Sequence, residues 1–239
     1  TGGYVTDEDL QGIETAINSK VSSGSTNYGG GNLAVGEESI ASGSMSTAVG
    51  YGAKSGQDST AIGYRTSAEK SHSVAVGNQT RAYEDGTIAI GYTAGAYAKN
   101  SIAIGSYTYN TEESDTLWTD DTKAVAENAI AIGGVSRANA VDSIALGMTS
   151  HVSDHAPSGI AIGAFSDAQD AYNVVIGAHS IADSDYSIAL GAYSKATYDN
   201  SVALGAYSTV TRDDSVSLGF IKDDGTAYTR TIQYVTAGV

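Results

Sequence analysis

The residues of this sequence that could do chemistry begin with two neighbouring histidines. His151 and His155 could in principle share a metal ion, but they lie near a two-residue insertion in a loop, with no helix to align them. The Glu that zinc proteases carry directly after the first histidine is also missing. The chain has no Cys, which excludes thiolate chemistry and disulfides. The sequence therefore predicts no metal site and no cofactor.

Acidic pairs are the second candidate for chemistry, and they recur at the polar end of many repeats. They include Asp183 with Asp185, Asp213 with Asp214, and Asp223 with Asp224. Because such pairs abound, pairing alone does not indicate acid–base catalysis, and the glycine-rich nonapeptide of calcium β-rolls is absent. No nucleophile elbow or phosphate-binding glycine loop occurs, and we find no charged column among the repeats. The sequence therefore predicts no catalytic residues and no enzyme.

Composition limits the possible partners. The 239-residue chain carries a formal net charge of −15, which argues against nucleic acid and against docking to an anionic membrane surface. It has no apolar stretch of about 18 residues that would span a membrane as a helix. Hydrophobic residues make up 41%, yet only two are Phe and one is Trp. These numbers predict a thin core of small and β-branched residues.

An internal repeat determines the organisation of the chain. Strings related to Ser-Ile-Ala-Ile-Gly recur, and most of the intervals between their final glycines equal 14 residues. Bulky β-branched residues flank an alanine two places before this glycine, and small residues alternate with large or polar ones after it. Since neighbouring residues of a strand point to opposite faces, each unit predicts strand, turn, strand, turn. Stacked units would form a solenoid with two parallel sheets, with the glycine at a corner where a positive φ or close backbone approach is needed.

The uniform alanine column predicts self-association. If the β-branched columns fill the interior, the alanines point outward, and a solvated strand face would normally carry larger or polar residues. We therefore expect a second copy of the chain to pack closely along this column in a closed cyclic oligomer. The alternative is that alanine merely fills a cramped corner within one chain. The predicted interface comprises Ala48, Ala61, Ala75, Ala89, Ala103, Ala131, Ala145, Ala161, Ala189 and Ala203.

Two further features depart from the repeat. Residues 7–21 predict a short amphipathic helix, preceded by a capping box that begins at Thr6. An insertion at about residues 109–121 carries the single Trp, Trp118, after which the repeat resumes at Thr122. Trp118, Tyr107, Tyr193 and Tyr207 are the candidate residues for binding a partner, because Trp and Tyr are frequent in interfaces. Trp118 could instead hold the loop against the roll, and the tyrosines could reflect strand propensity alone.

The pattern Ser-(Ile/Val)-Ala-(Ile/Leu)-Gly at 14-residue spacing resembles the YadA-like head of trimeric autotransporter adhesins. The resemblance covers residues 32–219, and residues 230–238 resemble the neck that follows such heads. It implies an all-β, left-handed parallel β-roll and a homotrimer. It also implies a virulence-associated adhesin on a Gram-negative cell surface, anchored in the outer membrane by a C-terminal region. The implied partners are host receptors, matrix proteins or other bacteria.

This resemblance divides the chain into three parts: residues 1–31 with the helix and a linker, the roll at 32–219, and the start of a neck at 220–239. Two functions follow from it. The roll is either an adhesive head that binds a protein or glycoprotein, or a passive spacer that presents a more distal binding domain.

Overall fold

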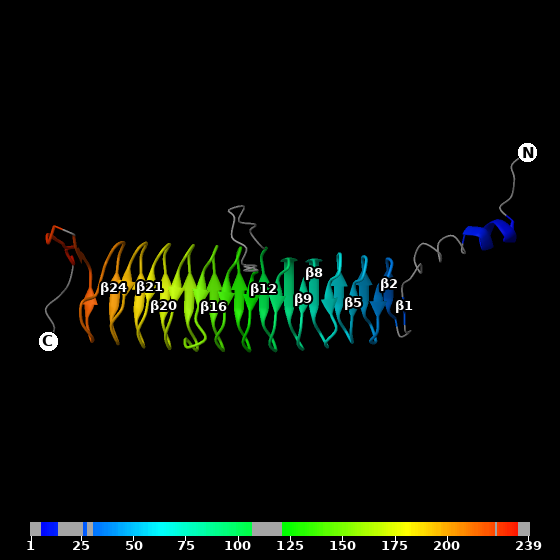
Figure 1. Ribbon diagram of the computed structural model, residues 1–239, viewed down its shortest axis with the longest axis horizontal. Coiled ribbons are helices and arrows are strands. Elements are labelled where there is room, and N and C mark those ends of the chain that lie inside the picture. Colours follow the sequence, from blue (N-terminus) through cyan, green and yellow to red (C-terminus); the bar gives the residue numbers. More distant parts are fainter. Residues whose placement is uncertain (1–5, 14–25, 28–30, 107–120, 223, 234–239) are drawn as a thin grey trace, which may run out of the picture. The chain divides into compact units, whose positions relative to one another are not determined.

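The computed structural model describes residues 6–13, 26–27, 31–106, 121–222 and 224–233. The chain divides into two compact units, residues 1–122 and residues 123–239, each described by itself below. In both units the chain winds through successive coils of two short strands joined by tight corners (Figure 1). Register partners such as Ala89 with Ala103 and Ala131 with Ala145 are one repeat apart. The prediction of an all-β parallel solenoid with 14-residue coils is confirmed.

The first unit contains two parallel sheets, the A sheet and the B sheet. Each coil contributes a two-residue strand to the A sheet and a longer strand to the B sheet. The A sheet comprises β1 (Thr26–Asn27), β3 (Ile40–Ala41), β5 (Lys54–Ser55), β7 (Ser67–Ala68), β9 (Arg81–Ala82) and β11 (Gly95–Ala96). The B sheet comprises β2 (Leu33–Val35), β4 (Thr47–Val49), β6 (Thr60–Ile62), β8 (Val74–Asn78), β10 (Ile88–Tyr92) and β12 (Ile102–Ile104).

The second unit repeats this arrangement and adds a hairpin. Its A-sheet strands are β13 (Lys123–Ala124), β15 (Arg137–Ala138), β17 (His151–Val152), β19 (Asp167–Ala168), β21 (Ile181–Ala182) and β23 (Lys195–Ala196). Its B-sheet strands are β14 (Ile130–Ile132), β16 (Ile144–Leu146), β18 (Ile160–Ile162), β20 (Val174–Ile176), β22 (Ile188–Leu190), β24 (Val202–Leu204) and β25 (Val216–Ser217). After the last coil, β26 (Phe220–Ile221) and β27 (Ala227–Tyr228) form an antiparallel pair.

The interior of each unit is built from small side chains. Its four columns are the alanines of both sheets and the Ser or Thr residues that precede each strand, almost all with no exposed surface. The largest fully buried side chains are Val152, Val175 and Asn173, followed by threonines such as Thr66. A 14-residue coil brings its two strands too close together for Ile or Leu to fit between them. The core is therefore thin, as the composition predicted.

Most of the buried hydroxyl groups are satisfied locally, with Ser55 and Ser101 as exceptions among the described residues. Serines after the glycine corner commonly donate to the glycine carbonyl three residues earlier, as Ser166 does to Gly163 at 2.8 Å and Ser194 to Gly191 at 2.7 Å. Asn173 replaces serine in one coil, where Nδ2 donates to the Ala182 carbonyl at 2.9 Å. Because a buried polar group without a partner costs about 1–3 kcal/mol, these bonds let serine occupy the core.

The glycine corners show both the positive φ and the close backbone approach that the sequence predicted. Gly36 has φ +116°, and a Cβ on it would lie 2.7 Å from the carbonyl oxygen of Gly50 in the next coil. The corners also hold non-glycine residues in the left-handed region, including Phe165 at φ 57° and Tyr193 at φ 58°. Sequence reasoning did not predict these, because aromatic residues are uncommon in that conformation.

The N-terminal helix is confirmed over residues 7–13, and the remainder of the expected range 7–21 lies outside the described residues. Its predicted cap is present: the Asp9 amide donates to Thr6 Oγ1 at 3.2 Å, and the Thr6 amide donates to Asp9 Oδ2 at 2.9 Å. The Thr6 hydroxyl also donates to Asp9 Oδ2 at 2.6 Å, and this bond, together with that from the Thr6 amide, lowers the pKa of Asp9 from its ordinary value of 3.8. The repeat resumes after the insertion at Thr122, whose carbonyl accepts from the Gly95 amide at 3.0 Å.

Candidate binding surfaces

The alanine column faces the interior, so its predicted outward position is wrong. Ala61, Ala103 and Ala145 are 0% exposed within a single chain, and every other member of the predicted interface is buried as well. A side chain with no exposed surface cannot contact a second chain. The alternative weighed for this column, a cramped corner within one chain, is right that a single chain buries the alanines, but they lie in the B-sheet strands and not at the corners.

The β-branched and Leu columns occupy the outer face of the B sheet instead. In the first unit, Leu33 is 46% exposed, Ile62 40% and Ile90 36%. In the second unit, Leu146, Ile176 and Leu204 are 40%, 43% and 42% exposed. Residues three before the glycine, such as Ile130 and Ile144, are half-buried on the same face. Each unit thus presents a regular apolar strip to its surroundings.

A ladder of stacked rings follows one corner of the second unit. Phe165, His179, Tyr193 and Tyr207 occupy the same position in successive coils, with neighbouring centroids 4.8, 4.9 and 5.0 Å apart. Phe220 and Tyr228 of the hairpin extend the series. A non-glycine residue in the left-handed region costs about 1 kcal/mol or more, and each stacked pair returns about 0.5–1.5 kcal/mol. Stacking thus stabilises the unusual corner conformation.

The predicted partner-binding residues fall into two groups. Tyr193 and Tyr207 belong to the ring ladder and are 44% and 52% exposed, so their edges and hydroxyl groups are accessible. Tyr107 and Trp118 lie outside the described residues. At the opposite corner of the same unit, Tyr172 and Tyr186 form a separate stacked pair with centroids 5.1 Å apart.

Basic residues gather on the outer face of the A sheet, contrary to the expectation that no column is charged. Four of the chain's 12 Lys and Arg residues lie four places after a repeat glycine, and a fifth, Lys123, occupies the equivalent strand position after the insertion. They are Lys54 and Arg81 in the first unit and Lys123, Arg137 and Lys195 in the second. The offset from the glycine could have revealed this column in the sequence. Other coils carry isoleucine, serine, glycine, histidine, threonine and the acidic Asp167 at this position, and they obscured the pattern.

Arg81 is the most strongly held of these cations in the first unit. Its Nη1 donates to Tyr83 Oη at 3.0 Å, and this hydrogen bond raises the pKa of the guanidinium. The Tyr83 ring stacks on Tyr97 with centroids 4.6 Å apart. Burial raises the pKa of Tyr97 above its ordinary value of 10.0. The arrangement holds a fixed positive charge at the sheet surface.

The two histidines considered for a metal site have different partners. His151 Nδ1 lies 2.8 Å from Asp167 Oδ1, on the A sheet. His155 Nδ1 lies 3.0 Å from Asp154 Oδ1, in an exposed loop. Within the described ranges, no group of three His, Cys, Asp or Glu residues is placed to hold a metal ion.

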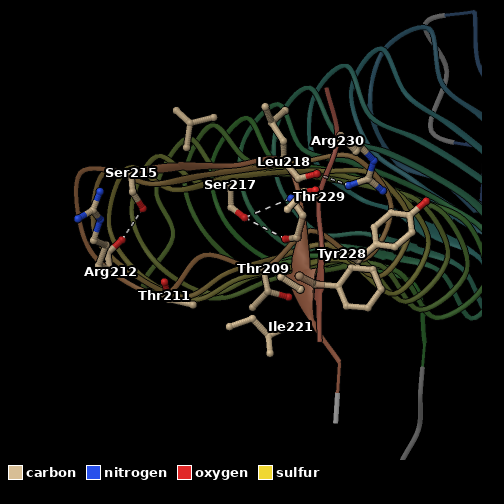
Figure 2. Close-up of a pocket in the computed structure, with 14 residues that line it drawn as sticks. Thr209, Thr211, Arg212, Ser215, Ser217, Leu218, Ile221, Tyr228, Thr229 and Arg230 are labelled. Carbon is tan, nitrogen blue, oxygen red and sulfur yellow. Dashed lines mark hydrogen bonds between the residues drawn. The ribbon is translucent and has the colours of Figure 1, made fainter. Parts of the chain in front are cut away.

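A pocket of ≈ 580 Å³ lies beside the last coil of the second unit (Figure 2). Residues of the last coil and of the β26–β27 hairpin line it, including Thr209, Ser217, Tyr228 and Arg230. The Arg230 guanidinium donates to the Ala206 carbonyl at 2.6 Å, to Ser208 Oγ at 2.9 Å and to the Leu218 carbonyl. These bonds commit the Arg230 guanidinium to joining the hairpin to the coils.

In the described part of the chain, no helix has the length and apolar character required to cross a bilayer. The described residues present exposed apolar strips, stacked rings and corners. These features define a repeat protein of the parallel β-roll class, whose outward side chains are available for contact with other molecules.

The sequence matches the family described as the YadA head domain repeat over residues 33–53, 55–80, 82–108, 124–150, 174–194 and 196–220. These segments make up well over half of the chain, and the chain belongs to this family of trimeric autotransporter adhesin heads. The family is structural and adhesive, and its members are displayed on the outer surface of Gram-negative bacteria. Family membership confirms the resemblance found in the sequence.

Among solved structures, the chain is similar to the collagen-binding domain of the Yersinia adhesin YadA. The two are 28% identical, the match covers 76% of this chain and 74% of that one, and the TM-score is 0.41. No curated protein matches the chain significantly.

Proposed function

We propose that this chain is the head of a homotrimeric cell-surface adhesin and that the trimer assembles through the outer faces of its B sheets. The observation that carries the proposal is the exposed apolar strip. Ile62, Ile90, Leu146 and Leu204 are each more than a third exposed in the single chain. Regular apolar strips of this kind mark surfaces that another protein covers. Identical strips on identical chains suit a closed cyclic assembly.

The surfaces that this assembly leaves free would contact the partner. They are the outer face of the A sheet and the corners, including the ring ladder with Tyr193 and Tyr207. Tyr suits such contacts because it offers a large apolar surface with a polar tip. The proposed partner is a protein or glycoprotein of a host cell, the extracellular matrix or another bacterium. A C-terminal region would anchor the adhesin in the outer membrane, and the head itself would catalyse no reaction.

The direct test has two parts. Sedimentation equilibrium gives the mass of the assembly, which the proposal requires to be three times 24.3 kDa. Binding is then measured to host cells, to other bacteria and to a panel of matrix proteins that includes collagen, the ligand of the Yersinia domain. Absence of binding across the whole panel by a trimeric head would favour the spacer function.

The contribution of the ring ladder is tested with matched double variants. Tyr193→Ala with Tyr207→Ala removes two ladder rings, and Tyr172→Ala with Tyr186→Ala removes a stacked pair of similar exposure at the opposite corner. If the ladder contacts the partner, only the first pair weakens adhesion, while both lower the melting temperature. Equal adhesion by the two variants would remove the ladder from the binding surface.

A further inference from the structure

The outer face of the A sheet in the first unit contains a hollow of ≈ 630 Å³. Three cations line it: Lys54 from β5, Arg65 from the corner before β7, and Arg81 from β9. The register places Lys54 beside Ser67 and Ser67 beside Arg81. Lys54 and Arg81 are therefore two strand spacings apart, about 10 Å. The small Ser67 between them leaves an open floor.

Arg65 is held over this hollow by its surroundings. The neighbouring corner residue is Gly52, with φ +62°, and a Cβ there would make ordinary van der Waals contact with Arg65 Cγ at 3.4 Å, so the arginine stem lies against this corner. The guanidinium lies 5.3 Å from the ring centroid of Tyr64 and 6.0 Å from that of Tyr51, whose rings stack on each other. These contacts restrict the side chain and lower the entropy that binding would cost.

The acids that line the hollow are engaged by hydroxyl groups. Glu69 Oε1 accepts from Ser67 Oγ at 3.0 Å, and Glu38 hydrogen-bonds to Tyr51, where its negative charge raises the pKa of the phenol. Within the described residues, Lys54, Arg65 and Arg81 form no ion pair shorter than 4.0 Å with a carboxylate. A chain with a net charge of −15 thus concentrates three available cations in one small region.

This concentration of charge is not explained by stability. Like charges on neighbouring strands are unfavourable, and Lys54 and Arg81 are separated by a single strand of the A sheet. In the second unit, the same outward column also places two cations side by side, Lys123 and Arg137. A ligand that brings negative charge would convert this cost into attraction.

We propose that this hollow binds an anionic polysaccharide, a sugar chain that bears sulfate or carboxylate groups. The two guanidinium groups supply planar, bidentate donors that match such groups, and Lys54 adds a third charge. Half-buried Ser67 gives the floor of the hollow a polar group that suits a sugar hydroxyl. The inference deepens the proposed adhesin function, on which it rests, by naming a class of ligand.

Nucleic acid fits the hollow less well. Base recognition by single-strand binders needs open aromatic faces, but Tyr83 is stacked on Tyr97, and Tyr51 and Tyr64 are stacked on each other beneath Arg65. Duplex DNA also carries one charge per about 1.7 Å, so a long segment would meet the acidic remainder of the chain. A polysaccharide with more widely spaced charges can engage three cations and avoid much of this repulsion.

The test measures the affinity of the intact chain for heparin, with hyaluronan, neutral dextran and single-stranded DNA as comparison probes. Arg65→Gln and Arg81→Gln each remove one charged donor, and Lys70→Gln removes an exposed corner lysine of the same unit outside the hollow. A hydrogen bond to a charged group contributes about 1.5–3 kcal/mol. Each arginine variant should therefore weaken heparin binding about tenfold or more, with the control within about twofold.

The outcomes separate this inference from the adhesin function. Heparin binding that falls with added salt and with both arginine variants, and that neutral dextran does not reproduce, supports the site. No heparin binding, equal losses for Lys70→Gln, or equally tight binding of single-stranded DNA overturns it. Hyaluronan binding that the arginine variants also weaken supports recognition of carboxylates. A head that still adheres to cells or matrix while failing to bind heparin would keep the adhesin function and reject the polysaccharide site.

Discussion

Two neighbouring residues of β6, Ala61 and Ile62, give the sharpest test of which face of the roll is the interior. Ala61 is 0% exposed, whereas Ile62 is 40% exposed on the apolar strip that we propose as the trimer interface. The perturbation is the same in both cases, a substitution to Glu. Ala61→Glu should unfold the coils around it, whereas Ile62→Glu should leave the coils intact and abolish assembly.

The magnitudes follow from these exposures. A carboxylate at Ala61 would be buried among alanine and serine without a partner, at a cost of several kcal/mol that approaches the whole stability of a domain. Fully burying an Ile side chain contributes about 1.5–3 kcal/mol. The 40% of Ile62 that remains exposed can therefore contribute roughly 1 kcal/mol per chain on assembly, or about 3 kcal/mol per trimer. Ile62→Glu removes this gain and also buries three carboxylates at the interface.

The assay combines far-ultraviolet circular dichroism with sedimentation equilibrium on both variants and the parent chain. Ala61→Glu should lose the β-sheet signal, and Ile62→Glu should keep it while sedimenting as a single chain of 24.3 kDa in dilute solution. A wild-type mass and melting temperature for Ile62→Glu would refute the proposed interface. A folded, unchanged Ala61→Glu protein would refute the placement of the alanine column in the interior.

Three further predictions address single contacts. Gly36→Ala should lower the melting temperature, because φ is +116° and a Cβ would meet the backbone of the next coil. The expected loss of unfolding free energy is at least about 1–3 kcal/mol. The control Gly12→Ala, where a Cβ would have nothing within 4 Å, should only raise helix content. Arg230→Ala leaves the Ala206 and Leu218 carbonyls without their donor, which should destabilise the last coils by about 1–3 kcal/mol. Hydrogen exchange should therefore become faster in residues 206–219 but not in residues 144–152. Thr6→Ala should raise the pKa of Asp9 toward 3.8, while Thr6→Ser keeps it low, as measured by NMR titration. Because that pKa is lowered in the folded helix, the helix stabilisation by Asp9 is present above pH 3.8 and is lost as the pH falls through the folded value.

Regular spacing made much of the fold predictable. A repeat of 14 residues requires equivalent residues to be strand neighbours, and Ala89 with Ala103 are such neighbours. The glycine corner, the cap at Thr6 and the resumption of the repeat at Thr122 were predictable for the same kind of reason. Each depends on local geometry or on the alignment of one copy with the next.

The candidate sites were predictable only in part. Tyr193 and Tyr207 could be identified as outward residues, but nothing in the sequence showed that their rings would stack with those of Phe165 and His179. That contact depends on the left-handed corner conformation, which aromatic residues seldom adopt. The basic column was missed because its members are separated by a full coil in sequence and become neighbours only when the coils stack.

The sequence by itself determined the repeat, the two parallel sheets and the family. It left open which side of each B-sheet strand faces inward, because strand alternation defines two faces and both faces here are apolar. Only the tertiary structure decided this question. Two strands of a 14-residue coil lie so close together that Ala and Ser fit between them, and the larger Ile and Leu side chains must point outward, where another chain can cover them.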